Sequence, residues 1–392
     1  MNARSTALHC LALWASLALA GTASTRAVEL STQCPPSFER LVDGTCALRT
    51  LYDTYARIDG HGGARTALPP VRQGFTPGQI DLGRHLFFDR LLSADGRSSC
   101  ASCHQPSRGL SDGRATASGF GGAALTRRTP TLWNVGFADR LFWDGRATTL
   151  EAQAEGPLFS ANEMGNTHEG LLARMNASAE YRRLFAQAFG RAAEAPIALP
   201  EIETSLAAFQ STLISLNSRY DRYVHGDASA MSPQEVRGLN VFRGFVARCT
   251  QCHTPPLFTN FQLAVIGSPP SPGHIVDVGA GAFSEDPLLR GAFKVPTLRN
   301  VTRTGPRYFH AGQLKSLDEA VSFYNARRGH ALPAGERQAI HWHVHMLKPQ
   351  LDPADVKAIV AFLGALEDES MLPAVPTTVP SGMPVIFPGD RK

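Results

Sequence analysis

The chain has 392 residues, 43% of them apolar, which is enough for one large or two medium-sized domains with buried cores. The formal net charge is only +4 and there is no run of basic residues, which argues against a nucleic-acid-binding role. A docking face for a charged protein partner is compatible with this composition.

The first residues have the features of a secretory signal peptide. Arg4 supplies a positive charge, and Ala7–Leu19 form an apolar core too short to cross a bilayer. Ala18-Leu19-Ala20 offers the small residues of a cleavage site, with Ala23 as an alternative. No other stretch is apolar for long enough to span a membrane. We therefore expect a periplasmic protein without a membrane span.

Two cysteines stand apart from the motifs described below. Cys34 and Cys46 lie twelve positions apart in a segment that contains proline and glycine. In an oxidising compartment, such a pair is expected to form a disulfide that closes a small loop. Two free thiols are the alternative.

A helix is predicted to begin after Thr76, and a similar one after Ser232. The starting sequences TPGQ and SPQE are capping boxes with proline at the first helical position. Apolar residues follow at helical spacing and are expected to face the core: Ile80, Leu82, Leu86 and Phe87 in the first helix, and Val236, Leu239, Phe242 and Val246 in the second.

Each predicted helix is followed by a CxxCH motif, CASCH or CTQCH. This motif is the attachment signal for c-type haem, in which the thiols bond the porphyrin and the histidine ligates the iron. A zinc site built from the two CxxC pairs is the alternative, but it leaves both histidines without a role. The candidate cofactor-binding residues are Cys100, Cys103, His104, Cys249, Cys252 and His253.

The two halves stay similar beyond these motifs. PTLWNV at 130–135 matches PTLRNV at 296–301, and FWDG at 142–145 matches FHAG at 309–312. The chain is therefore predicted to hold two copies of one helical haem module. The predicted organisation is a signal peptide at 1–20, an N-terminal extension at 21–75, a first haem domain at 76–220, a second haem domain at 221–370 and a flexible tail at 371–392.

The duplication also predicts a difference between the two irons. Tyr324 lies seven residues after Leu317, and Pro157 lies seven residues after the equivalent Leu150. A phenol can ligate iron, whereas proline has no side-chain donor. Haem 2 would then be six-coordinate, and haem 1 would be five-coordinate with an open face. The alternative is that Tyr324 is an ordinary half-buried tyrosine of an amphipathic helix.

The motifs together resemble the bacterial di-haem cytochrome c peroxidases and their relative MauG. The resemblance runs from about Gln79 to Leu366 and rests on LGRHLFFD, CASCH, RRTPTLWN, LFWDGR, EAQAEGPLFSANEMG, CTQCH, FKVPTLRN, YFHAG and SLDEAVSFY. It implies a mainly α fold, with two tandem class-I cytochrome c-like domains packed together and one covalently attached haem in each.

The resemblance also implies roles for individual residues. His104 and His253 become the proximal iron ligands, and Trp143 becomes the tryptophan between the haems that relays electrons. Gln153 and Glu163 resemble the polar residues over the peroxide-binding iron, where a carboxylate can act as a general acid and base. On their own, Trp143 would be a core aromatic and Glu163 a surface acid.

Two departures from the peroxidase pattern make the chain more similar to MauG. Phe120 stands where typical peroxidases have a histidine that caps haem 1. Tyr324 stands where they have the methionine ligand of haem 2, with Tyr308 as the second candidate. A tyrosinate ligand favours ferric and higher oxidation states of iron.

A third departure concerns the inter-haem calcium ion of the family. Arg128 replaces its asparagine ligand, while Thr304 and Pro306 still match the backbone donors. We hypothesise that the guanidinium replaces the charge of the ion, pairing with haem propionates. Alternatively, Arg128 points elsewhere and calcium binds.

One further motif lies in AIHWHVHML, where His341, His343 and His345 alternate. Without an acidic partner at ligand spacing, we predict a loop or surface role for them rather than a metal site.

The predicted function is the reduction of hydrogen peroxide at haem 1, with electrons relayed through haem 2 from a small periplasmic donor protein. One alternative is a MauG-like, peroxide-dependent oxidation of residues in a partner protein. The other is a non-catalytic di-haem electron carrier, which would keep both irons six-coordinate.

Overall fold

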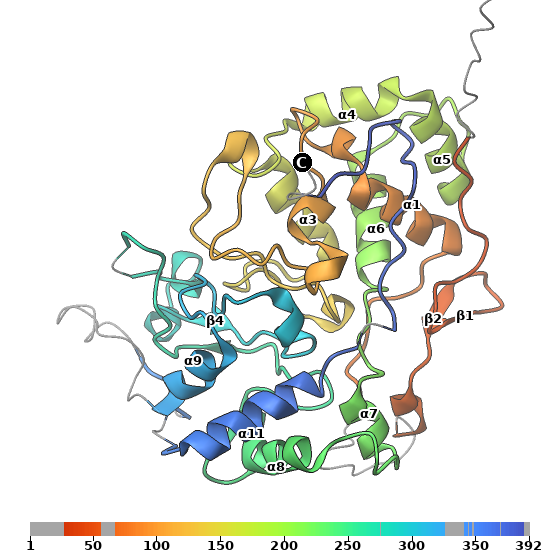
Figure 1. The fold of residues 1–392 in the computed structure, drawn as a ribbon. Coiled ribbons are helices and arrows are strands. Elements are labelled where there is room, and N and C mark those ends of the chain that lie inside the picture. Colours follow the sequence, from red (N-terminus) through yellow and green to blue (C-terminus); the bar gives the residue numbers. More distant parts are fainter. Residues whose placement is uncertain are drawn as a thin grey trace, which may run out of the picture.

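The computed structural model describes residues 27–55, 67–274, 276–325, 341–343, 345–346, 349–368 and 370–387. Within these ranges the chain is mainly helical and has two small two-stranded sheets. Figure 1 shows one group of helices that contains α1, α3, α4, α5 and α6, and a second group that contains α7, α8, α9 and α11. This arrangement agrees with the predicted mainly α, two-domain fold.

The N-terminal extension forms a hairpin of β1 (Phe38–Arg40) and β2 (Cys46–Leu48), which pair antiparallel. A disulfide joins Cys34, which precedes β1, to Cys46, the first residue of β2. The Tyr52 side chain, which follows the hairpin, is 1% exposed and reaches the second domain, where its hydroxyl donates a hydrogen bond to Asp221 at 2.5 Å. The extension therefore contacts a buried part of the second domain.

The first domain packs around the pair α1 and α6. Its helices are α1 (Pro77–Phe88), α2 (Cys100–Cys103), α3 (Leu150–Phe159), α4 (His168–Ala177), α5 (Ala179–Phe189) and α6 (Leu199–Gln210). Thr76 caps α1 through the backbone N–H of Gln79, and the Gln79 side chain accepts from the Thr76 backbone, as the capping box predicted. A side chain at Gly83 would meet the Ser205 carbonyl of α6, so glycine permits this close crossing.

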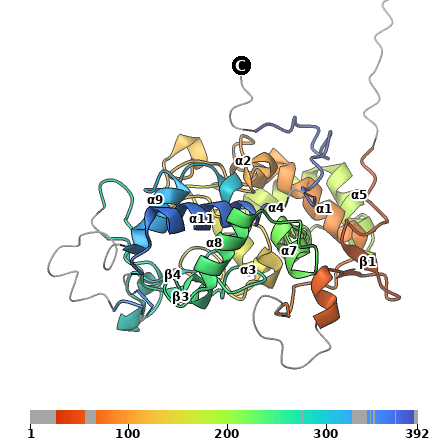
Figure 2. The same ribbon diagram turned by 60° about the horizontal axis from the view of Figure 1, so that its bottom comes forward.

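The second domain repeats this arrangement with α8 (Pro233–Arg243) and α11 (Pro353–Gly364), which lie side by side in Figures 1 and 2. Gly238 of α8 approaches the Ala358 carbonyl as Gly83 approaches Ser205. Among the described residues, this domain also contains α7 (Arg219–Val224), α9 (Leu317–Ser322), β3 (Leu263–Ala264) and β4 (Phe293–Lys294). The strands β3 and β4 pair antiparallel.

Backbone geometry repeats in the two copies. Asn134 and its equivalent Asn300 both adopt left-handed backbone, with φ of 60° and 55°. Phe142 and its equivalent Phe309 do the same, with φ of 63° and 65°. Non-glycine residues seldom adopt this conformation, so its recurrence at matched positions supports the internal duplication.

Three details differ from the sequence-based expectation. Helix α8 ends at Arg243 because the backbone of Gly244 is extended, so Val246 lies outside the helix and is 64% exposed. Helix α7 packs into the core of the second domain through Tyr220 and Val224, so the domain boundary precedes α7.

The third difference is the C-terminal segment, for which we expected a flexible tail. Residues 370–387 have no helix, and Figure 1 shows them running back to the first domain. Val379 is buried in the core of that domain, Phe387 packs against it, and the Ser381 hydroxyl donates to Asp89 at 2.6 Å. These apolar side chains and one carboxylate hold the segment in place.

Candidate functional site

The two CxxCH motifs have matching geometry. The first forms the short helix α2, and the second forms a 3-10 turn at Cys249–Gln251. His104 Nδ1 lies 3.0 Å from the Leu110 carbonyl oxygen, and His253 Nδ1 lies 3.0 Å from the Phe258 carbonyl oxygen. A histidine that ligates a metal characteristically donates its other ring N–H in this way. The Nε2 atom of each ring is thus left to bind iron.

Burial determines the protonation state of the histidine and cysteine side chains in both motifs. It lowers the pKa of His253 to about 4 and also lowers the pKa of His104, so both rings are neutral at physiological pH. Burial raises the pKa of Cys100 and Cys249 to about 12, so both side chains are thiols. Neutral imidazoles and free thiols are the forms that ligate haem iron and add to porphyrin vinyl groups.

The first cavity has a volume of about 680 Å³ and brings together the residues predicted around haem 1. Its lining includes Cys100, Cys103, His104, Trp143, Gln153, Pro157 and Glu163. Pro157 lies within α3, where its ring offers no metal donor. Burial raises the pKa of Glu163, although Arg146 partly offsets this, so the carboxyl group holds its proton more tightly than an exposed glutamate does.

Phe120 supports the loop that carries Glu163. Its backbone N–H donates to the Asn162 carbonyl at 2.9 Å, and its ring lies about 2.9 Å from the place that a Gly165 Cβ would occupy. Phe120 is not among the residues that line the first cavity. The residue at this position therefore packs against the Glu163–Gly165 loop.

A loop of the second domain completes the wall of the first cavity. Ser271, His274, Val276, Asp277 and Val278 all line it. Arg127 of the first domain holds this loop through a bidentate ion pair with Asp277, with both N···O distances at 2.8 Å. The sequence carries no local signal for this contact, because its partners are 150 residues apart.

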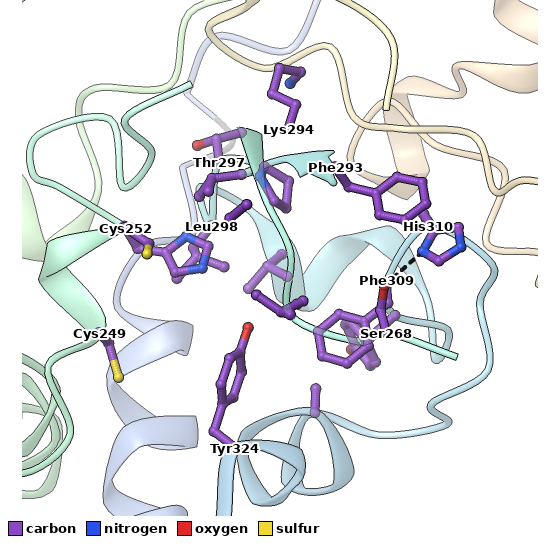
Figure 3. A pocket seen from close by; sticks show the side chains of 18 of the residues that line it. Cys249, Cys252, Ser268, Phe293, Lys294, Thr297, Leu298, Phe309, His310 and Tyr324 are labelled. Carbon is purple, nitrogen blue, oxygen red and sulfur yellow. Dashed lines mark hydrogen bonds between the residues drawn. The ribbon is translucent and has the colours of Figure 1, made fainter. Parts of the chain in front are cut away.

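The second cavity has a volume of about 240 Å³ and is lined by Cys249, Cys252, His253 and Tyr324. In Figure 3 the Tyr324 hydroxyl points into the space beside the motif, with Cys249 and Cys252 to one side. Burial raises the pKa of Tyr324, with smaller contributions from these two cysteines. Tyr308 also lines the cavity, but its charged neighbour is Arg128. Of the two tyrosines, Tyr324 is therefore the one that lies beside the motif.

The histidine-rich segment lies in a loop, as expected, but it does not lie apart from the site. His343 and His345 line the second cavity, and their ring centroids are 5.1 Å apart. Met346 lines the same cavity. Across the part of the chain that is described, no group of three or more histidine, cysteine or acidic residues could hold a metal ion.

Trp143 lies between the two cavities and lines both. Its indole Nε1–H donates to the Arg128 carbonyl at 2.8 Å, and its own carbonyl accepts from the Lys294 N–H at 2.7 Å. The Arg128 side chain is 7% exposed, and its guanidinium donates to the Thr304 carbonyl. Trp143 and Arg128 were predicted from the sequence, whereas Lys294, which occupies the position of Arg128 in the second copy, was not.

The donor sets fit c-type haem better than zinc. Each motif presents two thiols and an imidazole to its own cavity, and the two cavities lie on either side of Trp143. A zinc site made of both CxxC pairs would need all four thiols together. Within the described ranges, no helix is long and apolar enough to cross a membrane.

Comparisons with known proteins agree with this site. Residues 77–229 match the di-haem cytochrome c peroxidase family. The methylamine utilization protein MauG of Methylorubrum extorquens is 38% identical over 304 residues, which cover 76% of this chain and 81% of that protein. Cytochrome c551 peroxidase of Nitrosomonas europaea is 35% identical over 268 residues, which cover 66% of this chain and 76% of that protein.

Solved structures show the same similarity. A MauG-like protein associated with microbial copper homeostasis superposes with a TM-score of 0.68 at 31% identity, covering 78% of this chain and 95% of that one. The matched family consists of di-haem peroxidases, which implies two c-type haems and an oxidoreductase activity of the peroxidase type. This chain therefore belongs to the di-haem cytochrome c peroxidase family, which includes MauG.

Proposed function

We propose that the protein reduces hydrogen peroxide in the first cavity with electrons that enter at the second. The observation that carries this proposal is the shared cavity of His104, Glu163 and Pro157. It combines a proximal ligand, a buried acid and a face without a metal donor. A steady-state assay with hydrogen peroxide and reduced cytochrome c tests it; no turnover above the haem-free background would contradict it.

We assign His104 and His253 as proximal ligands, with the paired cysteines of each motif attaching the porphyrin. When bound, the haem of the first cavity would supply an iron at which peroxide could react. The bond between His104 Nδ1 and Leu110 fixes the orientation of the proximal ring. Pro157 adds no metal donor to the lining of this cavity, and Gln153 offers an amide that would orient peroxide.

Glu163 moves the protons of the reaction. As a carboxylate it accepts a proton from HOOH, and as an acid it returns this proton to the departing oxygen when the O–O bond breaks. Two further protons from solvent and two electrons from the donor protein complete the conversion to two water molecules. The raised pKa of Glu163 suits this double role, because the group exchanges protons more easily near neutral pH.

Electrons from the donor protein would enter at the second cavity and pass from there to the first. Tyr324 would help to hold the haem of the second cavity through its phenol oxygen, which its position beside Cys249 and Cys252 supports. Trp143 carries charge between the sites, because its indole lines both cavities. The aromatic ring provides a conducting path where aliphatic side chains would not.

A MauG-like oxidation of residues in a partner protein is the second candidate. Two observations favour it: the tyrosine at position 324, and the 38% identity to MauG. In this reaction the electrons come from side chains of the partner instead of a redox protein. Adding peroxide with and without reduced cytochrome c, and then following oxidation of a co-purifying partner by mass spectrometry, separates the two.

For the electron donor we propose a docking patch next to the second motif. Phe245 and Val246 are 84% and 64% exposed, and the Arg248 guanidinium lies 4.2 Å from the Phe245 ring centroid. Residues 236–276 contain three arginines and no acidic residue. This combination suits a small periplasmic redox protein with an acidic rim around an apolar centre.

We also propose that Arg128 takes the place of the family's calcium ion. Its guanidinium donates to the carbonyl of Thr304, one of the two backbone groups expected to bind calcium. A cation already bonded to this oxygen would repel a second one. Metal analysis of the purified protein should find no stoichiometric calcium; one tightly bound calcium per chain would contradict the proposal.

A further inference from the structure

Two buried cations occupy equivalent positions in the two copies. Arg128 lies two residues before Pro130, and Lys294 lies two residues before the equivalent Pro296. Arg128 is 7% exposed, and Lys294 is half-buried in β4. Both side chains line both cavities. The chain thus places one positive charge from each copy where the cavities meet.

The backbone contacts of the two residues are reciprocal. The Arg128 N–H donates to the His310 carbonyl at 2.7 Å, and the Lys294 N–H donates to the Trp143 carbonyl at 2.7 Å. His310 and Trp143 are themselves equivalent in the two copies. Each cation is therefore held against the opposite domain in the same way, in an approximate two-fold arrangement.

Neither cation forms an ion pair with a carboxylate of the described residues. The Lys294 ammonium lies 5.8 Å from the Phe261 ring centroid, and Figure 3 shows it turned away from Cys252 and Tyr324. The Arg128 guanidinium bonds to the Thr304 carbonyl and the Ser111 hydroxyl, and its Nε has no partner among these residues. Burial accordingly lowers the pKa of Lys294 to about 8 and that of Arg128 to about 10.

Two other arginines, one partly buried and one fully buried, have carboxylate partners. Arg127 bonds to Asp144 and Asp277, and Arg299 bonds to Asp221. The chain therefore gives these arginines directly bonded carboxylates, whereas Asp112 acts on Arg128, and Asp139 on Lys294, only through space. A cation taken out of water without a bonded counter-ion is unfavourable, so the place where the cavities meet favours a further anion beside these two side chains.

We propose that Arg128 and Lys294 form a built binding site for carboxylate groups, which receives the propionates of the two haems where the cavities meet. The inference rests on the proposed function, because it takes both cavities to hold haem. A cation beside a propionate favours the reduced iron, since reduction removes one positive charge from the haem. The two side chains thereby raise the reduction potentials of the haems and link them electrostatically.

The test uses the purified di-haem protein and three variants: Lys294→Met, Lys294→Arg and, as a control on the exposed face of α11, Lys357→Met. Spectroelectrochemical titration measures the midpoint potential of each haem. We expect Lys294→Met to lower the potential of the first-cavity haem more than that of the second. Lys294→Arg and Lys357→Met should stay close to the parent protein.

Resonance Raman bands of propionate bending give a second readout, which should shift in Lys294→Met and in the milder Lys294→Gln. If the potentials and the Raman bands do not change while two haems remain bound, this inference is wrong but the proposed function still stands. Absence of two c-type haems from the parent protein would instead overturn the proposed function. If Lys294→Met does not fold, Lys294→Gln decides by the same two measurements.

Discussion

The indole of Trp143 donates a 2.8 Å hydrogen bond to the backbone carbonyl of Arg128, and this bond fixes the ring where the two cavities meet. The Trp143 carbonyl is in turn bound by Lys294 of the second domain. The aromatic ring between the cavities is therefore positioned by one residue from each copy. Its orientation therefore depends on how the two domains pack.

Replacing Trp143 tests its role as a relay. Trp143→Phe removes the Nε1–H bond and the indole but keeps an aromatic ring, so both haems should remain bound. We expect turnover with the donor protein to fall roughly tenfold or more, which corresponds to about 1.4 kcal/mol in the barrier. Steady-state kinetics provide the measurement. Trp133→Phe, a buried tryptophan that lines only the second of the two cavities, is the matched control; equal losses in both variants would refute the relay.

Removing the carboxyl group of Glu163 tests proton transfer. Glu163→Gln should lower kcat/KM for peroxide by about 10²–10⁴-fold, because the amide can neither accept nor return a proton. Glu155→Gln, on the exposed part of α3, should have no such effect. A Glu163→Gln variant with full activity would show that another group carries the protons.

The pH profile gives an independent check on Glu163. The carboxylate form of Glu163 is the base, and burial raises its pKa. Activity should therefore rise with pH, and the midpoint of this rise should lie above the pKa of an exposed glutamate. This acidic limb should disappear in Glu163→Gln, whose residual activity should be flat over the same range. An identical limb in both proteins would assign it to a different group.

The docking patch predicts that a substitution within it changes the KM for the donor protein only. Phe245→Ser should raise the KM for the reduced donor protein by roughly five- to thirtyfold, matching about 1–2 kcal/mol for an interface aromatic. The KM for peroxide should stay unchanged. Phe283→Ser removes another exposed phenylalanine, 62% exposed, and serves as the control. Donor turnover should also slow as ionic strength rises, because salt screens Arg243 and Arg248.

The buried ion pair of Asp221 and Arg299 predicts how two substitutions change the free energy of unfolding. Both side chains are 0% exposed, and the Tyr52 hydroxyl adds a hydrogen bond to the same carboxylate. Arg299→Met should lower the free energy of unfolding by about 3–5 kcal/mol, because it leaves a buried charge unpaired. Tyr52→Phe should lower it by about 1.5–3 kcal/mol. Chemical denaturation followed by circular dichroism measures both, and Tyr223→Phe is the control.

The same ion pair determines the direction in which the stability of the protein changes with pH. Burial disfavours the Asp221 carboxylate, but Arg299, Tyr52 and Ser218 outweigh this, so its pKa lies below the ordinary value of 3.8. The stability from this group is present above that ordinary value and is lost as the pH falls through the lower folded value. Parent protein and Arg299→Met should therefore differ most near neutral pH and converge in strong acid.

Local and repeated signals made much of this fold predictable. Short stretches of sequence were enough to predict three features: the capping box at Thr76, the two CxxCH motifs, and the matched positions of Trp143 and His310. They specify local backbone or recur at equivalent places, so one copy could be used to interpret the other. Lys294 could have been found by the same comparison, because it aligns with Arg128.

Contacts between distant segments could not be predicted in this way. The placement of Asp277 in the wall of the first cavity, of Tyr52 beside Asp221, and of Val379 in the first domain depends on how whole segments pack. No periodicity or spacing encodes such contacts. The exposed position of Val246 was also missed, because the extended backbone of Gly244 ends α8 one turn early.

The ferric spin states of the purified protein test the central claim most directly. Tyr324 in the second cavity and Pro157 in the first predict one six-coordinate and one five-coordinate haem. Electron paramagnetic resonance at low temperature should therefore show one low-spin and one high-spin ferric haem. Two low-spin signals of equal intensity would mean that a side chain ligates the iron held by His104, and would contradict the account.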